Sequence, residues 1–219
     1  ISVDAGNGAL SGDSTGHSGV ATVRVRVTDQ TGLSAEADVT VDVNAVPRLA
    51  DTGLSLVEGR ALSVTLSPTD ADGPVADLVL ALVSAPGWIN FDPATGRITG
   101  DSAGQVGRHL VTVSVTDRDG LSSQGTLTVT VLAVPVLTGG SVTLTEGAAL
   151  AFAPTVTDAD STAAQLTFAK VSGPAWITVD PVTGALSGDS TGHPGEAVLR
   201  LSVTDQNTLT AEADVAIDV

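Results

Sequence analysis

An internal repeat of 88 residues constrains the fold of this chain more than any other feature. Residues 1–43 align without a gap to residues 177–219, and 28 of the 43 positions are identical. The offset is 176 residues and residues 89–131 fall midway, so the period is half of that offset, 88 residues. Self-similarity at a fixed period is typical of arrays of one structural unit. The sequence therefore predicts two and a half copies of a small domain.

Two prolines mark the expected domain boundaries. Alternating strands run into VNAVP (43–47) and VLAVP (131–135), where a proline cannot continue a strand ladder. The expected domains are residues 1–43, the second half of a truncated repeat, and two complete repeats, 44–131 and 132–219. Half a sandwich leaves strand edges and an apolar face bare. We therefore expect residues 1–43 to be frayed or completed by a neighbouring molecule. Because the chain lacks an initiating Met, we also expect it to be a piece of a longer protein.

Strand-like alternation runs through each repeat. Val111, Val113 and Val115 share one face, with Thr and Ser opposite, and 127–131 repeats this pattern. A period of two is typical of strands, and Val and Thr suit a pleated, half-buried surface. Turn signals such as EGR, DADG, DPATG, GDSAG and TDRDG recur about every ten residues. About seven short strands per repeat, without helical periodicity, predict an all-β, antiparallel sandwich.

Charge and composition narrow the classes of partner. Asp and Glu total 25 against 9 Lys and Arg, which gives a formal net charge of −16. This charge repels nucleic acid and anionic membrane surfaces, so cations are the expected partners. The chain has no cysteine, which excludes disulfides and thiolate metal sites. We see no signal peptide or long apolar run, and therefore expect no direct membrane insertion.

The segment GDSTG, residues 12–16, fits the G-x-S-x-G pattern of a serine nucleophile. A nucleophile elbow requires a strand followed by a helix, but here a strand follows. The motif also recurs at Ser102 and Ser190, and Gln105 replaces the histidine that follows as His17 and His193. We therefore interpret the motif as a turn and predict no catalytic residues. His109 is interpreted as a satisfied or solvated histidine.

Carboxylates recur at fixed places in each repeat. A Glu precedes a Gly, an Asp-Ala-Asp follows, and an Asp ends the strand VSVTD or LSVTD. Clustered carboxylates on loops supply the oxygen ligands that Ca²⁺ requires. The alternative is that these acids only sit in turns, where Asp is favoured. The candidate metal ligands are Glu58, Asp70, Asp72, Asp101, Asp117, Glu146, Asp158, Asp160 and Asp205.

The order P…VEG…TDADG…GWINFDPATGRITGD…VTVSVTDRDG…LTVTV carries a family resemblance. It resembles tandem bacterial immunoglobulin-like repeats related to dystroglycan-type cadherin domains, over nearly the whole chain. The resemblance implies tandem seven-stranded Ig/cadherin-like sandwiches in large secreted or surface proteins, typically adhesins or non-catalytic parts of polysaccharide-active enzymes.

The resemblance also implies roles for the acidic residues. Asp70, Asp72 and Asp117 match the cadherin DxD and strand-end Asp, as Asp158, Asp160 and Asp205 do in the next repeat, and Glu58 and Glu146 match the cadherin glutamate. In cadherins these sets meet at a junction and hold Ca²⁺. The sequence departs from cadherins at its linkers, since only Asp42 and Asn44 precede Pro47 and TVLAVP has no acidic residue. One ion per junction is therefore expected rather than three. Asp101, like Asp13 and Asp189, either caps its turn or is a ligand near the junction.

The expected function is a non-catalytic adhesive or structural spacer at a bacterial cell surface or in the extracellular space, with Ca²⁺ limiting bending between neighbouring repeats. A second hypothesis is a carbohydrate-binding module, for which Trp88 and Trp176 would have to be exposed; the alternating Ile89 and Phe91 favour a core position for Trp88 instead. A third is a filament subunit, with residues 1–43 completed by another chain. Possible partners are a polysaccharide or another surface protein.

Overall fold

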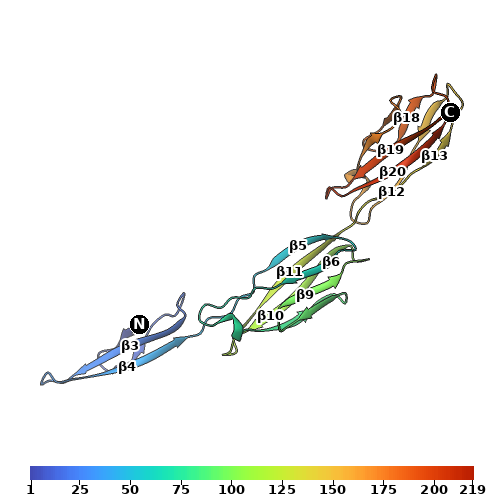
Figure 1. Ribbon diagram of the computed structural model, residues 1–219. Coiled ribbons are helices and arrows are strands. Elements are labelled where there is room, and N and C mark those ends of the chain that lie inside the picture. The colour runs from blue at the N-terminus through green and yellow to red at the C-terminus, as the bar shows by residue number, and fades with distance from the viewer. The chain divides into compact units, whose positions relative to one another are not determined.

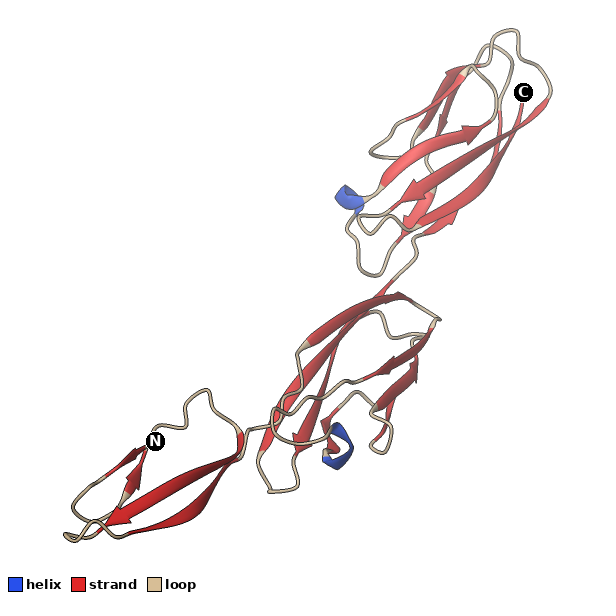
Figure 2. Cartoon of the chain, turned by 60° about the vertical axis from the view of Figure 1, so that its left-hand side comes forward, coloured by secondary structure: helices blue, strands red, loops and turns tan.

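The computed structural model describes all 219 residues, and its regular structure is almost entirely β-strand (Figures 1 and 2). Two single-turn 3-10 helices, η1 (Val75–Asp77) and η2 (Ala163–Gln165), are the exceptions. None of the helices is long and apolar enough to cross a membrane. The predicted all-β fold class is confirmed.

The middle repeat has seven strands in two sheets. One sheet has the order β5-β11-β10-β7 and the other β6-β9-β8, so strands far apart in sequence are neighbours. This is the predicted number of strands for one repeat. The strands are β5 (Thr52–Val57), β6 (Ala61–Thr65), β7 (Val79–Ser84), β8 (Ile89–Asp92), β9 (Arg97–Asp101), β10 (Gly107–Thr116) and β11 (Ser122–Leu132).

The C-terminal repeat has the same two sheets and one additional pair of strands. Its sheets have the orders β13-β20-β19-β16 and β14-β18-β17, and β12 pairs with β15. β13 and β20 are parallel, whereas β19 pairs antiparallel with both β16 and β20. The strands are β12 (Val136–Thr138), β13 (Gly140–Thr143), β14 (Ala149–Phe152), β15 (Thr155–Thr157), β16 (Thr167–Ser172), β17 (Ile177–Val179), β18 (Leu186–Asp189), β19 (Glu196–Thr204) and β20 (Thr210–Asp218).

Burial follows the alternation of the strands. In β10 the alternating valines that the sequence assigns to one face, Val111, Val113 and Val115, are at most 1% exposed. In the C-terminal repeat one cluster of apolar side chains fills the sandwich. Burial of the apolar surface of these side chains is the main source of the stability of the repeat. That cluster contains Leu150, Leu166, Phe168, Ile177, Leu186, Leu199, Leu201, Val203, Val215 and Ile217.

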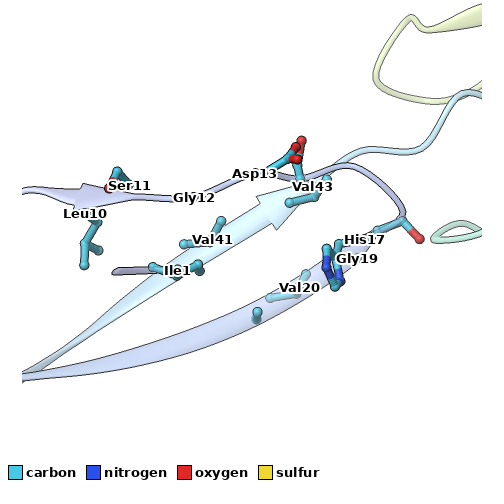
Figure 3. A pocket seen from close by; sticks show the side chains of 13 residues that line it. Ile1, Leu10, Ser11, Gly12, Asp13, His17, Gly19, Val20, Val41 and Val43 are labelled. Carbon is cyan, nitrogen blue, oxygen red and sulfur yellow. The ribbon is translucent and has the colours of Figure 1, made fainter. Parts of the chain in front are cut away.

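Residues 1–43 form two hairpins whose apolar face is open. β1 (Ser2–Val3) pairs with β2 (Leu10–Ser11), and β3 (Gly19–Thr28) pairs with β4 (Ser34–Val43) along their whole length. The strands are therefore paired, and the expectation that this segment is frayed or completed by a neighbouring molecule stays a prediction. No residue of 1–43 is buried, and a hollow of about 390 Å³ lies over the face of the hairpins, beside residues such as Ile1 and Val41 (Figure 3).

Candidate metal site

Three aspartates meet at one end of the C-terminal repeat. Asp158 and Asp160 lie in the loop between β15 and η2, and Asp205 directly follows β19. One carboxylate oxygen of each lies within 4.8 Å of the others. Asp205 is only 5% exposed, and the other two are half-buried. The structure thus brings together the DxD pair and the strand-end Asp that the sequence assigns to one site.

Each of these aspartates uses one oxygen to hold the backbone and leaves the other without a partner. Oδ1 of Asp158 accepts hydrogen bonds from the N–H groups of Asp160 and Ser161, both at 3.0 Å. Oδ2 of Asp160 accepts from Ala133 N–H at 3.3 Å, and Oδ1 of Asp205 accepts from the N–H groups of residues 207 and 209, both at 2.8 Å. Oδ2 of Asp158, Oδ1 of Asp160 and Oδ2 of Asp205 are buried and make no hydrogen bond. The loop is therefore fixed by half of its carboxylate oxygens, and the other half remain available as ligands.

Ser161 carries another buried, unpartnered oxygen, a feature that sequence reasoning missed. Its Oγ is also buried without a hydrogen-bond partner, in the residue directly after Asp160. The middle repeat has Gly73 at this position, 88 residues earlier, and that difference was the available signal. Ca²⁺ takes 6 to 8 oxygen ligands and tolerates irregular geometry. The three carboxylates are a partial set of this kind, which water, backbone or hydroxyl oxygens can complete.

The electrostatics of the cluster favour a cation. Burial and the neighbouring Asp158 carboxylate, with a smaller contribution from Asp205, raise the pKa of Asp160 above its ordinary value. Like charges held together in a partly buried loop repel one another, and a divalent cation removes that repulsion. The donor set contains only hard oxygen atoms, which suit Ca²⁺ rather than a softer metal.

The corresponding residues of the middle repeat are arranged differently. Asp117 is buried, but its Oδ2 accepts a hydrogen bond from Asn44 Nδ2 at 3.1 Å. Asp72 is exposed and accepts from Ala45 N–H at 3.0 Å, and Oδ1 of Asp70 accepts from the adjacent Ala71 N–H at 2.8 Å. Burial and the nearby carboxylates of residues 72 and 117 raise the pKa of Asp70. These aspartates line one small pocket together with Asn44, and none of their carboxylate oxygens is both buried and unpartnered, in contrast to the C-terminal repeat.

The two glutamates bind the GDSxG turn of their own repeat. Oε1 of Glu58 accepts from Gly104 N–H at 2.8 Å, and Oε1 of Glu146 accepts from Gly192 N–H at 3.0 Å. Asp101 accepts from Ala103 N–H at 3.0 Å, which is a turn-capping contact. The structure therefore places Glu58, Glu146 and Asp101 with the GDSxG turns, and their role as metal ligands stays a prediction.

The serines of the GDSxG motif are structural in both complete repeats. Ser102 and Ser190 are 0% exposed. The Ser102 hydroxyl donates to Arg60 C=O at 2.7 Å, and the Ser190 hydroxyl donates to Ala148 C=O at 2.8 Å. A nucleophile must reach its substrate, whereas these hydroxyls hold the EG turn against the GDSxG turn.

The glycines of the motif have two separate purposes. The last glycine has a positive φ of 71° at Gly104 and 75° at Gly192, which L-residues rarely adopt. The first glycine makes room for tryptophan, because a Cβ on Gly188 would lie 2.5 Å from Trp176 O and 2.8 Å from its Cε3. The matching distances from Gly100 to Trp88 are 2.7 and 2.8 Å. The G-x-S-x-G pattern is thus accounted for by packing and turn geometry.

Trp88 and Trp176 are half-buried, so they are neither fully exposed, as a sugar platform requires, nor fully in the core. The Trp176 ring stacks on the exposed His193, with 5.3 Å between ring centroids and 9° between ring planes. One face of the indole is therefore already covered by an imidazole.

Comparison with known families agrees with this architecture. A model of the family described as "Putative Ig domain" matches residues 47–132 and again residues 134–219. The chain belongs to this family. Immunoglobulin-like repeat domains are typically extracellular and non-catalytic, and two tandem copies support an adhesive or structural role. No curated protein matches the chain.

Solved structures of cadherin ectodomains are similar in fold. Protocadherin gamma B2 extracellular cadherin domains 3–6 are 18% identical with a TM-score of 0.52, covering 91% of this chain and 60% of that structure. The protocadherin gamma B4 extracellular domain is 18% identical with a TM-score of 0.50, covering 94% of this chain and 41% of that structure. The chain thus spans 41–60% of the length of these structures, and at this identity the likeness shows the fold alone. The resemblance to tandem Ig/cadherin-like repeats is confirmed.

Proposed function

We propose that this chain is an adhesive or structural spacer of an extracellular, bacterial surface protein, and that Ca²⁺ binds its acidic loops and limits bending between repeats. The observation that carries the metal part is the set of unpartnered, buried oxygens on Asp158, Asp160 and Asp205. Buried polar atoms nearly always have a partner, so three aspartates that each carry an orphaned oxygen, and of which one carboxylate oxygen each lies within 4.8 Å of the others, point to a ligand.

Asp160 connects the proposed ion site to the segment that leads into the C-terminal repeat. Its Oδ2 holds Ala133 N–H, in the VLAVP segment that leads into the C-terminal repeat, while its Oδ1 is free for a cation. An ion that fixes the Asp160 carboxylate therefore also fixes the first residues of the repeat. Restricting that segment lowers the freedom of the linker, which is the property a spacer requires.

Calorimetry in the presence and absence of Ca²⁺ tests the metal part. We expect Ca²⁺ to raise the melting temperature of chelator-treated protein, because a ligand that binds only the native state stabilises it by about 2.7 kcal/mol at 100 times its Kd. Mg²⁺ should act more weakly, since it demands octahedral geometry and dehydrates reluctantly.

Asp158→Asn should abolish the Ca²⁺ effect. Asp214→Asn removes the same charge from the exposed face of β20 and should retain it. The absence of both binding heat and a melting shift in the wild type would overturn Ca²⁺ binding.

Carbohydrate binding is the alternative function that the tryptophans suggest. A sugar platform requires an open aromatic face, whereas Trp176 is half-buried and stacked on His193. Titration of soluble polysaccharides while following tryptophan fluorescence distinguishes the two functions. A saturable fluorescence change would favour this alternative.

A filament subunit is the third function, and the open face of residues 1–43 is the observation that favours it. Val27 and Val39 on the long β3–β4 hairpin are 70% and 38% exposed, whereas their equivalents Val203 and Val215 are 0% exposed. Completion of this half repeat by another copy of the chain would cover that face. Concentration-dependent assembly, measured by analytical ultracentrifugation, would support this function, and a monomer at all concentrations would remove it.

A further inference from the structure

The two complete repeats differ at several positions around the acidic loop, among them Asp77, which corresponds to Gln165, and Arg118, which corresponds to Gln206. Residues 88 apart occupy equivalent positions, so Asn44 corresponds to Leu132, Gly73 to Ser161 and Asp119 to Asn207. The three aspartates that define the loop are shared by both repeats. The surroundings of a common carboxylate triad, rather than the triad itself, therefore distinguish the repeats.

Asn44 donates a hydrogen bond to the Asp117 oxygen that would otherwise be available to a metal ion. Asp117 Oδ1 binds the N–H groups of Asp119 and Leu121 at 2.9 and 2.8 Å, as Asp205 Oδ1 does at its own turn. Asp117 Oδ2 binds Asn44 Nδ2 at 3.1 Å, whereas the equivalent Oδ2 of Asp205 has no partner. The carboxamide N–H is thus the donor that satisfies the buried carboxylate of the middle repeat.

Leu132 cannot perform this role in the C-terminal repeat, because its side chain has no polar atom. Asp205 is consequently buried with one unsatisfied oxygen, which is a costly arrangement for a carboxylate. Ser161 Oγ adds a further unpartnered oxygen, where Gly73 has none to offer. Asp160 is half-buried while its counterpart Asp72 is exposed, so the C-terminal loop also retains less water around its charges.

We propose that the two repeats differ in metal binding: one Ca²⁺ binds in the C-terminal repeat, and in the middle repeat the Asn44 carboxamide takes its place as the partner of the buried carboxylate. This inference rests on the proposed Ca²⁺ function and assigns it to a single loop. The consequence is that Ca²⁺ stabilises the C-terminal repeat and the VLAVP segment, and leaves the segment that contains Asn44 unchanged.

Isothermal titration of Ca²⁺ into the chelator-treated full chain tests the assignment. We expect one Ca²⁺ per chain. Asp205→Asn should weaken binding by at least about tenfold, because loss of even a residue that only supports a metal ligand typically costs about 10–100-fold in affinity. The matched variant Asp117→Asn should leave affinity and stoichiometry unchanged. Circular dichroism of both variants without Ca²⁺ verifies that they fold, and a variant that does not fold is replaced by Asp160→Asn or its counterpart Asp72→Asn.

A gain-of-site variant complements these losses, because a gain cannot result from misfolding. Asn44→Leu combined with Gly73→Ser removes the carboxamide partner of Asp117 and adds the hydroxyl that the C-terminal loop has, and we expect the stoichiometry to rise from one Ca²⁺ to two. Two ions in the wild type, a loss of binding in Asp117→Asn alone, or a double variant that still binds one ion would each overturn the proposed asymmetry. No binding heat in the wild type would instead overturn the underlying Ca²⁺ function.

Discussion

The buried hydroxyl of Ser190 gives a direct test of how the GDSxG motif is used. It donates to Ala148 C=O at 2.8 Å and to Thr145 C=O at 3.2 Å. Ser190→Ala leaves these carbonyls without that donor and should cost about 1–3 kcal/mol in the free energy of unfolding, measured by urea denaturation. Ser14→Ala is the control, since Ser14 is exposed and its loss should cost little. Equal stability of Ser190→Ala and the wild type would contradict a structural role.

Thr208 is the one non-glycine residue with a positive φ, 67°. Its equivalents are Gly120, with φ of 92°, and Gly32, with φ of 85°, and a β-branched residue is strained in this region. Thr208→Gly should stabilise the chain by about 0.5–1 kcal/mol, because the relief of strain exceeds the added freedom of the unfolded chain. The reciprocal Gly120→Thr should be destabilising, and chemical denaturation measures both. Destabilisation by Thr208→Gly would show that the turn is not strained.

Asp180 makes a pH-dependent contribution to stability. The N–H groups of Thr183 and then Val182 lower the pKa of this carboxyl in the folded chain. A lowered folded pKa means that the stabilisation is present above the unfolded pKa of about 3.9 and is lost as the pH falls through the folded pKa. Urea midpoints between pH 5 and pH 2 should therefore fall less steeply in Asp180→Asn than in the wild type. Identical slopes would contradict this contribution.

At the scale of elements, β18 shows how a strand is shaped by its neighbour. Gly188 lies in the central strand of the β14-β18-β17 sheet, opposite Ile177, and the Trp176 ring covers it. Gly188→Ala should destabilise the repeat by about 1–3 kcal/mol and shift tryptophan fluorescence, because the new Cβ displaces the ring. Ser187→Ala on the same strand is exposed and serves as the control. An unchanged spectrum and midpoint for Gly188→Ala would show that the ring does not pack there.

The strands themselves were predictable because each burial pattern is local. Val111 and Val113 are buried since strict alternation places them on one face, and the GDSAG and TDRDG turns limit that strand. The additional pair β12 and β15 was not predictable, because its pairing of Leu137 with Val156 depends on tertiary contact rather than on periodicity. The acidic loops were predictable from the DxD pattern. The difference between them was not, because it depends on Asn44, a linker residue 73 positions from the Asp117 that it contacts.

At the scale of the whole molecule, the chain contains two hairpins of closely related sequence in different environments. β3–β4 and β19–β20 belong to segments with 28 of 43 identical residues, and both are continuous antiparallel ladders. Val27 is 70% exposed in the first hairpin, whereas its equivalent Val203 is 0% exposed in the second. Since tertiary burial rather than ladder hydrogen bonds supplies most of the stability, the two hairpins should open with different free energies.

Hydrogen exchange measured by mass spectrometry compares these hairpins within one sample. We expect amides of β19–β20 to exchange at least about tenfold more slowly than those of β3–β4, because opening the second hairpin exposes the apolar core. Alanine at Leu201, which is fully buried, should reduce this difference, whereas alanine at its exposed-face neighbour Arg200 should preserve it. Equal protection of the two hairpins would mean that the open face of residues 1–43 is covered in solution. Protection of β3–β4 that rises with protein concentration would identify the cover as a second copy of the chain.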